Sequence, residues 1–148
     1  MQLWRLSRHE SLNGEGGRRY AARWHSAGSP IVYLAESPPG ALIEILVHLE
    51  LDEFELPLAY RLLRVAVPGK LRIARLRVPP GDAWKSNLAL TRGIGDIWLK
   101  SQRSALARVP SAILPRTFNY LLNPLHPNAA RIAIAEAGSA TIDPRFIR

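Results

Sequence analysis

Glu44 is the residue whose type and surroundings most suggest chemistry. It lies in the apolar run Ala-Leu-Ile-Glu-Ile-Leu-Val-His-Leu, residues 41–49. Apolar neighbours would limit the access of water, and a carboxylate in such a place strongly stabilises a developing positive charge. Glu44 and His48 also lie on one face of the expected helix, which makes a solvent-exposed ion pair the alternative interpretation.

Four other residues carry polar or aromatic side chains in places that suit a binding site. Arg23 and Trp24 follow a glycine-rich stretch, and an arginine beside aromatic rings on a loop suits a phosphate with a stacked base or pyridine ring. Tyr33 lies in mid-strand, and Ser111 follows a proline in an apolar run. The alternatives are an arginine–aromatic surface contact, an ordinary half-buried strand tyrosine, and a serine bonded to nearby backbone.

Several common catalytic motifs are missing. The sequence has no phosphate-binding GxxxxGK[ST] loop, no GxGxxG fingerprint and no GxSxG nucleophile motif. It has no cysteine, and its four histidines (His9, His25, His48 and His126) show no local metal-ligand spacing. A conventional metalloenzyme or serine hydrolase is therefore disfavoured, and no metal is expected.

Length and charge limit the remaining possibilities. The 148 residues fit a single domain spanning 1–148. The net charge of +8 favours anionic partners, among them nucleic acid. Only three of the 20 basic residues are lysines, and the guanidinium of arginine binds phosphate or carboxylate bidentately. Codon usage is the alternative explanation for that bias.

The hydrophobic pattern predicts an α+β domain with mixed or antiparallel sheets and a few helices. A helix is expected after Ser37, which can cap it, with an apolar stripe ending at Leu49. One or two short helices are expected over 82–104, broken near two glycines. Residues 7–22 are expected to form a loop, and 119–128 a turn-rich segment. Strands are expected at 2–6, 31–35, 60–67, 71–78, 105–114 and 131–137, the third and fourth pairing as a hairpin.

No segment is expected to cross or enter a membrane. The longest apolar stretch, 41–51, is interrupted by Glu44, His48 and Glu50, and the N-terminus lacks an apolar run of signal-peptide length. We therefore expect a cytoplasmic protein.

Five blocks of sequence together resemble one known family. The resemblance covers nearly the whole chain, in order and with plausible spacing. It identifies the chain as similar to RES-domain toxins, the toxin half of RES–Xre toxin–antitoxin pairs. The matching blocks are residues 14–37, 41–49, 95–101, 109–112 and 119–127.

The resemblance implies a fold like that of ADP-ribosyltransferases and an activity that consumes NAD. Members of the family cleave the nicotinamide–ribose bond by hydrolysis or phosphorolysis, and some ADP-ribosylate a protein. The implied partners are a cognate Xre-family antitoxin, in a hetero-oligomer that blocks the active site, and a water, phosphate or protein acceptor. A basic nucleic-acid-binding or nuclease toxin is the competing interpretation, because of the charge.

The arginine, glutamate and serine that name the family correspond by position to Arg23, Glu44 and Ser111. Ser101 and Ser104 lie close enough in sequence to be alternatives for the serine. The resemblance assigns Glu44 to the oxocarbenium-like transition state and Arg23 to the diphosphate of NAD. Ser111 would bind the substrate or position Glu44.

Aromatic residues would complete the NAD site. Tyr33, with Tyr20 as a second candidate, would stack on nicotinamide or shape its pocket, and Trp24 would also contact NAD. The sequence departs from the family pattern at His25, where asparagine is more usual. Arginines on the expected hairpin could meet an acidic partner surface, or form a solvated sheet face: Arg61, Arg64, Arg72, Arg75 and Arg77.

Overall fold

A single curved sheet organises the molecule. The computed structural model describes residues 1–48 and 59–146, with the backbone but not the side chain of His48. Seven strands lie in the order β4-β5-β6-β2-β1-β3-β7. They are β1 (Gln2–Ser7), β2 (Val32–Ala35), β3 (Ala59–Ala66), β4 (Ile73–Arg75), β5 (Leu106–Pro110), β6 (Phe118–Leu122) and β7 (Ala133–Thr141).

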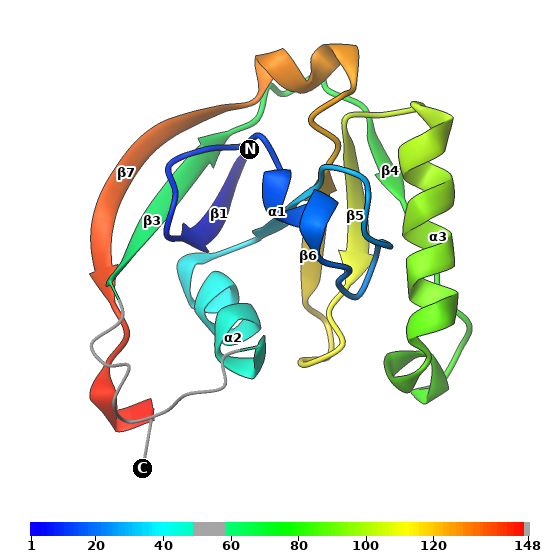
Figure 1. The fold of residues 1–148 in the computed structure, drawn as a ribbon, viewed down its shortest axis with the longest axis horizontal. Coiled ribbons are helices and arrows are strands. Elements are labelled where there is room, and N and C mark those ends of the chain that lie inside the picture. Colours follow the sequence, from blue (N-terminus) through cyan, green and yellow to red (C-terminus); the bar gives the residue numbers. More distant parts are fainter. Residues whose placement is uncertain (49–58, 147–148) are drawn as a thin grey trace.

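Within the described residues, three α-helices accompany the sheet (Figure 1). They are α1 (Glu15–Arg19), α2 (Pro38–His48) and α3 (Leu88–Ser101). Short 3-10 helices lie at Ala83–Ser86, Pro127–Arg131 and Pro144–Phe146. Strands β4 and β5 run parallel and the other neighbouring strands antiparallel, so the predicted α+β class with a mixed sheet is confirmed.

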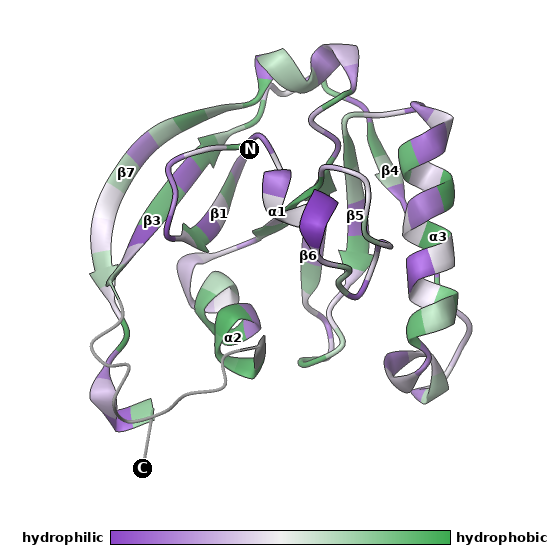
Figure 2. Cartoon of the chain, in the orientation of Figure 1, coloured by the Kyte–Doolittle hydropathy of each residue, from purple (hydrophilic) through white to green (hydrophobic). Residues whose placement is uncertain are grey.

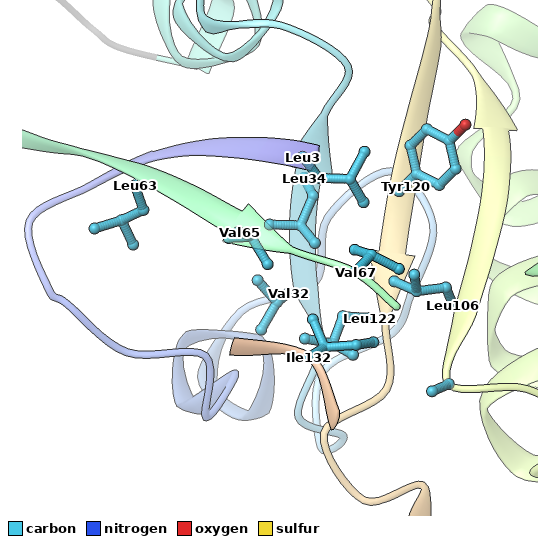
Figure 3. Packing of buried hydrophobic residues seen from close by; sticks show 11 residues of the cluster. Leu3, Val32, Leu34, Leu63, Val65, Val67, Leu106, Tyr120, Leu122 and Ile132 are labelled. Carbon is cyan, nitrogen blue, oxygen red and sulfur yellow. The ribbon is translucent and has the colours of Figure 1, made fainter. Parts of the chain in front are cut away.

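Alternation along the central strands divides the core between the two faces of the sheet. Leu106 pairs with Leu122 and both point into the core cluster that Figure 3 draws. The next residues along, Ala107 and Leu121, also pair but point into a second cluster around α3. Because β-strand side chains point to opposite faces in turn, both faces of β5 and β6 are covered.

Helix α2 forms as the sequence predicts. The Oγ of Ser37 accepts a 3.1 Å hydrogen bond from the backbone N–H of Gly40, which caps the first turn. Ala41, Leu42 and Ile45 pack with Leu6 of β1 in a third apolar cluster. Figure 2 shows α2 coloured hydrophobic over much of its length, whereas polar and apolar residues alternate along α3. Leu49, the predicted end of the stripe, lies outside the described residues.

The predicted break in the 82–104 segment is wrong. Helix α3 continues through Gly93 and Gly95 as one element. Asn87 caps it, since its side chain accepts a 3.1 Å hydrogen bond from the N–H of Leu90. A side chain at Gly95 would overlap the backbone carbonyl of Trp24. This glycine therefore serves a close approach between the helix and the 22–26 loop and does not end the helix.

The predicted hairpin is also wrong. Strand β3 lies between β1 and β7, whereas β4 lies at the opposite edge of the sheet and pairs with β5. Val65 and Val67 enter the first core cluster, but Leu76 packs in the cluster beside α3. Ile73 of β4 nevertheless packs against the first cluster, as the β3 residues do. Both segments thus bury apolar side chains without pairing with each other, and the chain crosses the sheet after residue 67. The predicted arginine surface is divided as a result. Arg61 and Arg64 lie on β3, whereas Arg72, Arg75 and Arg77 lie on or beside β4 at the far edge of the sheet.

Other element boundaries differ from those predicted. The 7–22 loop contains α1, and the first half of the turn-rich 119–128 segment is β6, a central strand. Strand β5 ends at Pro110, and β7 continues to Thr141. In β6 and β7, pairing with neighbouring strands outweighs the weak strand propensity of Asn119 and Gly138.

Candidate active site

The predicted site residues meet around a cavity of about 300 Å³. Strands β1, β2 and β6, helix α2, the 22–24 loop and the end of β5 contribute to its wall. Four predicted residues line it: Arg23, Trp24, Tyr33 and Glu44. The structure thus brings together side chains that lie far apart in the sequence.

The strands aim their side chains at this cavity through the sheet register. Asn119 of β6 pairs with Ala35 of β2, and Ala35 pairs with Trp4 of β1. Paired residues share a face of the sheet, and so do residues two apart on one strand. Tyr33 therefore lies on the same face as Asn119, and both line the cavity with Trp4.

Glu44 is held by two hydrogen bonds on one carboxylate oxygen. The Nδ2 of Asn119 donates to Oε1 over 2.7 Å, and the Oγ of Ser111 donates to the same oxygen over 3.2 Å. Oε2 has no partner among the side chains that the structure describes. The carboxylate is thus oriented from one side and retains acceptor capacity on the other. Any contact with the predicted ion-pair partner, His48, falls outside what is described.

Ser111 is the serine that the structure brings to Glu44. Besides its bond to the carboxylate, its Oγ accepts the N–H groups of Ile113 and Leu114 at 3.1 and 3.3 Å. Ser104 instead bonds to Trp98 and to the carbonyl of Leu106, and Ser101 donates to the carbonyl of Trp98. These two serines stabilise the end of α3 and do not line the cavity.

Arg23 reaches the cavity from a loop that α3 holds in place. Its Nη1 donates a 2.7 Å hydrogen bond to the carbonyl of Lys85, which fixes the guanidinium. Thr91 donates to the carbonyl of Arg23 over 2.6 Å, and Arg92 donates to that of Ala22 over 2.8 Å. The loop is thus attached to the rigid helix on both sides of its arginine.

Arg5 is a cavity residue that the sequence did not predict. Its Nη1 donates a 3.1 Å hydrogen bond to the carbonyl of Tyr33. Its buried Nε has no hydrogen-bond partner among the described residues. Desolvation by burial lowers the pKa of this guanidinium. A buried unpaired donor is costly, so an anionic ligand beside Arg5 would satisfy it.

The aromatic residues divide between core and cavity. Trp24 is buried and packs against Trp84, with ring centroids 6.0 Å apart, in the cluster beside α3. Tyr33 accepts the N–H of Trp24 at 3.1 Å, and burial raises the pKa of its phenol. Tyr20 lies outside this cavity and its side chain is exposed.

A wider groove of about 720 Å³ adjoins the cavity. The glycine-rich segment around α1 forms one of its walls, and Tyr20 lines it. Arg5, Ala22 and Tyr33 line both hollows and so stand where the two meet. An extended ligand could pass from one hollow to the other along these three residues.

Metal binding and membrane crossing find no support in the part of the chain that the structure describes. Over residues 1–48 and 59–146, no three histidine, aspartate or glutamate side chains gather as a metal site would require. No helix within those ranges combines the length and apolar character needed to cross a membrane.

Comparison with known proteins assigns the family. The RES domain family pattern matches residues 2–143. The chain belongs to the RES domain family. The resemblance recognised in the sequence is therefore confirmed, and the RES domain extends over nearly all of the described residues.

Two relatives of this RES domain carry informative names. "Toxin Res" of Pseudomonas putida strain KT2440 is 48% identical over 130 residues, covering 87% of this chain and 88% of the relative. "Prs ADP-ribosylating toxin" of Sphingobium sp. strain YBL2 is 35% identical over 144 residues, covering 94% of this chain and 88% of the relative.

A solved structure shares the fold of this RES domain. It is the crystal structure of the M. tuberculosis MbcT–MbcA toxin–antitoxin complex, with a TM-score of 0.74 and 20% sequence identity. The match covers 95% of this chain and 84% of that one. At this identity the comparison establishes the fold.

Proposed function

We propose that this RES domain cleaves the bond between nicotinamide and ribose in NAD. The observation that carries the proposal is Glu44, whose carboxylate lies on the wall of a cavity and is oriented by Asn119 and Ser111. Two arginines, Arg5 and Arg23, line the same cavity. A fixed carboxylate with nearby cationic groups suits a substrate that develops positive charge while carrying phosphates.

The chemistry needs one carboxylate. As the C–N bond breaks, its electron pair goes to the ring nitrogen, so nicotinamide leaves as a neutral molecule and requires no general acid. Positive charge builds on the ribose, and the negative charge of Glu44 stabilises it. An acceptor oxygen or nitrogen then bonds to the ribose carbon and gives up its proton. The two-carboxylate arrangement of glycoside hydrolases is therefore unnecessary.

The two adjoining hollows suit a dinucleotide. NAD consists of two nucleoside halves joined by a diphosphate, and Arg5 and Tyr33 stand between the cavity and the groove. In this arrangement the reacting half occupies the cavity beside Glu44, and the diphosphate lies near Arg5 and Arg23. The Tyr33 ring shapes the nicotinamide end, and the groove receives the adenosine half beside Tyr20.

We further propose that the protein is the toxin of a toxin–antitoxin pair. Relatives named "Toxin Res" support this role, as does the shared fold with a protein solved in a toxin–antitoxin complex. The expected partner is an Xre-family antitoxin, bound in a hetero-oligomer in the cytoplasm. Such a partner would prevent NAD loss in the cell that makes the toxin.

ADP-ribosylation of a protein is the second candidate. It is favoured by the relative named for ADP-ribosylating Prs, which covers 94% of this chain at 35% identity. Both activities share the same bond cleavage and differ in whether water, phosphate or a protein side chain accepts the ribosyl group.

The nuclease alternative, which rests on the net charge, gains no further support from the arrangement of the arginines. Arg61 and Arg64 lie on β3, whereas the other arginines predicted for a partner surface follow the opposite edge of the sheet. Arg61 and Arg64 are also paired with Glu10 and Glu136. A divided basic surface is a poor track for a nucleic-acid backbone.

One experiment tests the proposal and identifies the acceptor. Purified protein is incubated with NAD, with and without inorganic phosphate, and the products are separated by liquid chromatography and mass spectrometry. Nicotinamide release supports the proposed cleavage. ADP-ribose as the second product identifies water, a phosphorylated ADP-ribose identifies phosphate, and a modified protein identifies a transferase. Absence of nicotinamide release in all conditions would contradict the proposal.

A further inference from the structure

His25 is a buried polar residue that the proposed mechanism does not use. Its side chain is 1% exposed and lies between the cavity and the glycine-rich wall of the groove. Its Nδ1 lies 2.7 Å from the hydroxyl of Tyr33, and its Nε2 lies 3.0 Å from the backbone carbonyl of Gly17. Both ring nitrogens therefore have a partner.

The partner of Nε2 fixes the direction of one hydrogen bond, and the direction of the other follows for the neutral ring. The carbonyl of Gly17 can only accept, so Nε2 carries the ring proton and donates to it. In the neutral ring Nδ1 is then an acceptor, and the hydroxyl of Tyr33 donates to it. The same hydroxyl oxygen accepts the N–H of Trp24 at 3.1 Å. The phenol is thus held by one bond that it donates and one that it accepts.

We propose that His25 is a positioning residue that fixes the Tyr33 ring in the NAD site. The inference rests on the proposed function, because it concerns the ring that would meet nicotinamide. Tyr33 lines both hollows, and a hydrogen bond at the tip of its ring sets the tilt that the ligand encounters. The ring centroids of His25 and Tyr33 are 5.7 Å apart, and the rings are inclined by 50°.

The imidazole is itself confined from the groove side. A Cβ at Gly17 would come within 3.1 Å of Nε2 and 2.7 Å of the Ile31 side chain. The absence of a side chain at Gly17 therefore lets the imidazole approach the backbone of α1. His25 connects that groove wall to Tyr33 and leaves the tyrosine hydroxyl little freedom.

Two substitutions separate this role from simple anchoring of the glycine-rich segment. In His25→Asn the shorter amide places an oxygen near the position of Nδ1, which preserves an acceptor for Tyr33 and loses the contact to Gly17. In His25→Gln the longer amide reaches the position of Nε2, which preserves the contact to Gly17 and loses the acceptor for Tyr33. Each variant keeps a polar group in the buried site.

The test is steady-state NAD cleavage by both variants, alone and combined with Tyr33→Phe. We expect His25→Gln to lower kcat/KM by about tenfold and His25→Asn by about threefold or less. In the Tyr33→Phe background the two should differ by less than about twofold, because the hydroxyl through which His25 acts has been removed. Thermal unfolding midpoints record any loss of folding separately.

Ser26→Ala is the matched control. Ser26 lies in the same loop as His25, and its Oγ donates a 2.6 Å hydrogen bond to Asp96 of α3. Ser26→Ala removes this bond without touching Tyr33, so it should lower the midpoint of thermal unfolding and leave kcat/KM near the wild-type value. A larger loss in His25→Asn than in His25→Gln, or additive losses in the combined variants, would overturn the positioning role. If His25→Gln fails to fold, His25→Ala, which also removes the acceptor for Tyr33, takes its place in the combination with Tyr33→Phe. Failure of the wild-type protein to release nicotinamide would instead remove the proposed function itself.

Discussion

Asn119 donates a 2.7 Å hydrogen bond to the carboxylate of Glu44, a residue 75 positions earlier in the chain. The amide projects from a central strand and the carboxylate from a helix, so the sheet sets the orientation of the proposed catalytic group. The weaker contact from Ser111, at 3.2 Å, falls on the same oxygen. A carboxylate held in this way needs no reorganisation as positive charge develops in front of it.

Replacing Glu44 by Gln should lower NAD turnover by about 10²–10³-fold or more, because the charge is lost while shape and hydrogen-bonding capacity remain. The measurement is nicotinamide release at saturating NAD, with circular dichroism to verify the fold. Glu36→Gln is the control, since Glu36 is an exposed carboxylate that accepts the N–H of Phe118. Wild-type turnover in Glu44→Gln would refute the assignment.

Removing the two groups that orient Glu44 should have different effects. Asn119→Ala should lower kcat by about tenfold with little change in stability, since its amide makes the shorter bond to the carboxylate. Ser111→Ala should also lower the free energy of unfolding by about 1–2 kcal/mol, because its Oγ accepts two backbone N–H groups. Turnover kinetics and urea denaturation of both variants provide the comparison. If the two substitutions lower kcat and the free energy of unfolding to the same extent, the different roles of Asn119 and Ser111 are contradicted.

Arg23→Ala should weaken NAD binding by about tenfold, since a guanidinium–phosphate contact is charge-assisted. Arg5→Gln should weaken it at least as much, because the buried Nε of Arg5 lacks a partner in the described structure. Binding is measured by calorimetry on the Glu44→Gln background, so that NAD is not consumed. The exposed Arg131 serves as the control position, through Arg131→Ala. Unchanged affinity in either cavity variant would exclude that arginine from the site.

Gly95→Ala should destabilise the protein by about 3 kcal/mol or more, because the added methyl group overlaps the carbonyl of Trp24. Gly93→Ala, on the same helix, meets nothing within 4 Å and should stabilise it by about 0.5–1 kcal/mol through helix propensity. Urea denaturation measures both changes. Similar effects of the two substitutions would contradict the close approach between α3 and the 22–26 loop.

Alkaline pH should reveal the burial of Tyr33. Burial raises the pKa of its phenol, so the protonated form is favoured in the folded protein. Its contribution to stability is complete below the ordinary tyrosine pKa of about 10 and is lost as the pH rises through the higher folded value. Wild-type protein should therefore lose stability above pH ~10 more steeply than Tyr33→Phe. Absorbance at the phenolate band, compared between wild type and Tyr33→Phe, should show no ionisation of Tyr33 until well above that pH. Ionisation of Tyr33 near the ordinary tyrosine pKa of about 10 would contradict this.

The features that the sequence determined by itself are mostly local. Ser37 and the apolar stripe that follows it specify α2, because capping and helical spacing act within a few residues. Glu44 stood out because it is a charge among apolar neighbours on that helix. The ordered blocks that resemble RES domains were readable without any knowledge of how they pack.

The resemblance already linked Ser111 to Glu44, but only the tertiary structure added Asn119 and Arg5 to the site. Asn119 lay in a segment that composition marked as turns, and Arg5 carried no signal beyond its charge. Both reach the cavity because sheet register is a property of strands distant in sequence, which no local pattern encodes. The same reason explains the false hairpin: β3 and β4 are neighbours in the chain and both pack against the first core cluster, but β3 pairs with β1 and β7 whereas β4 pairs with β5.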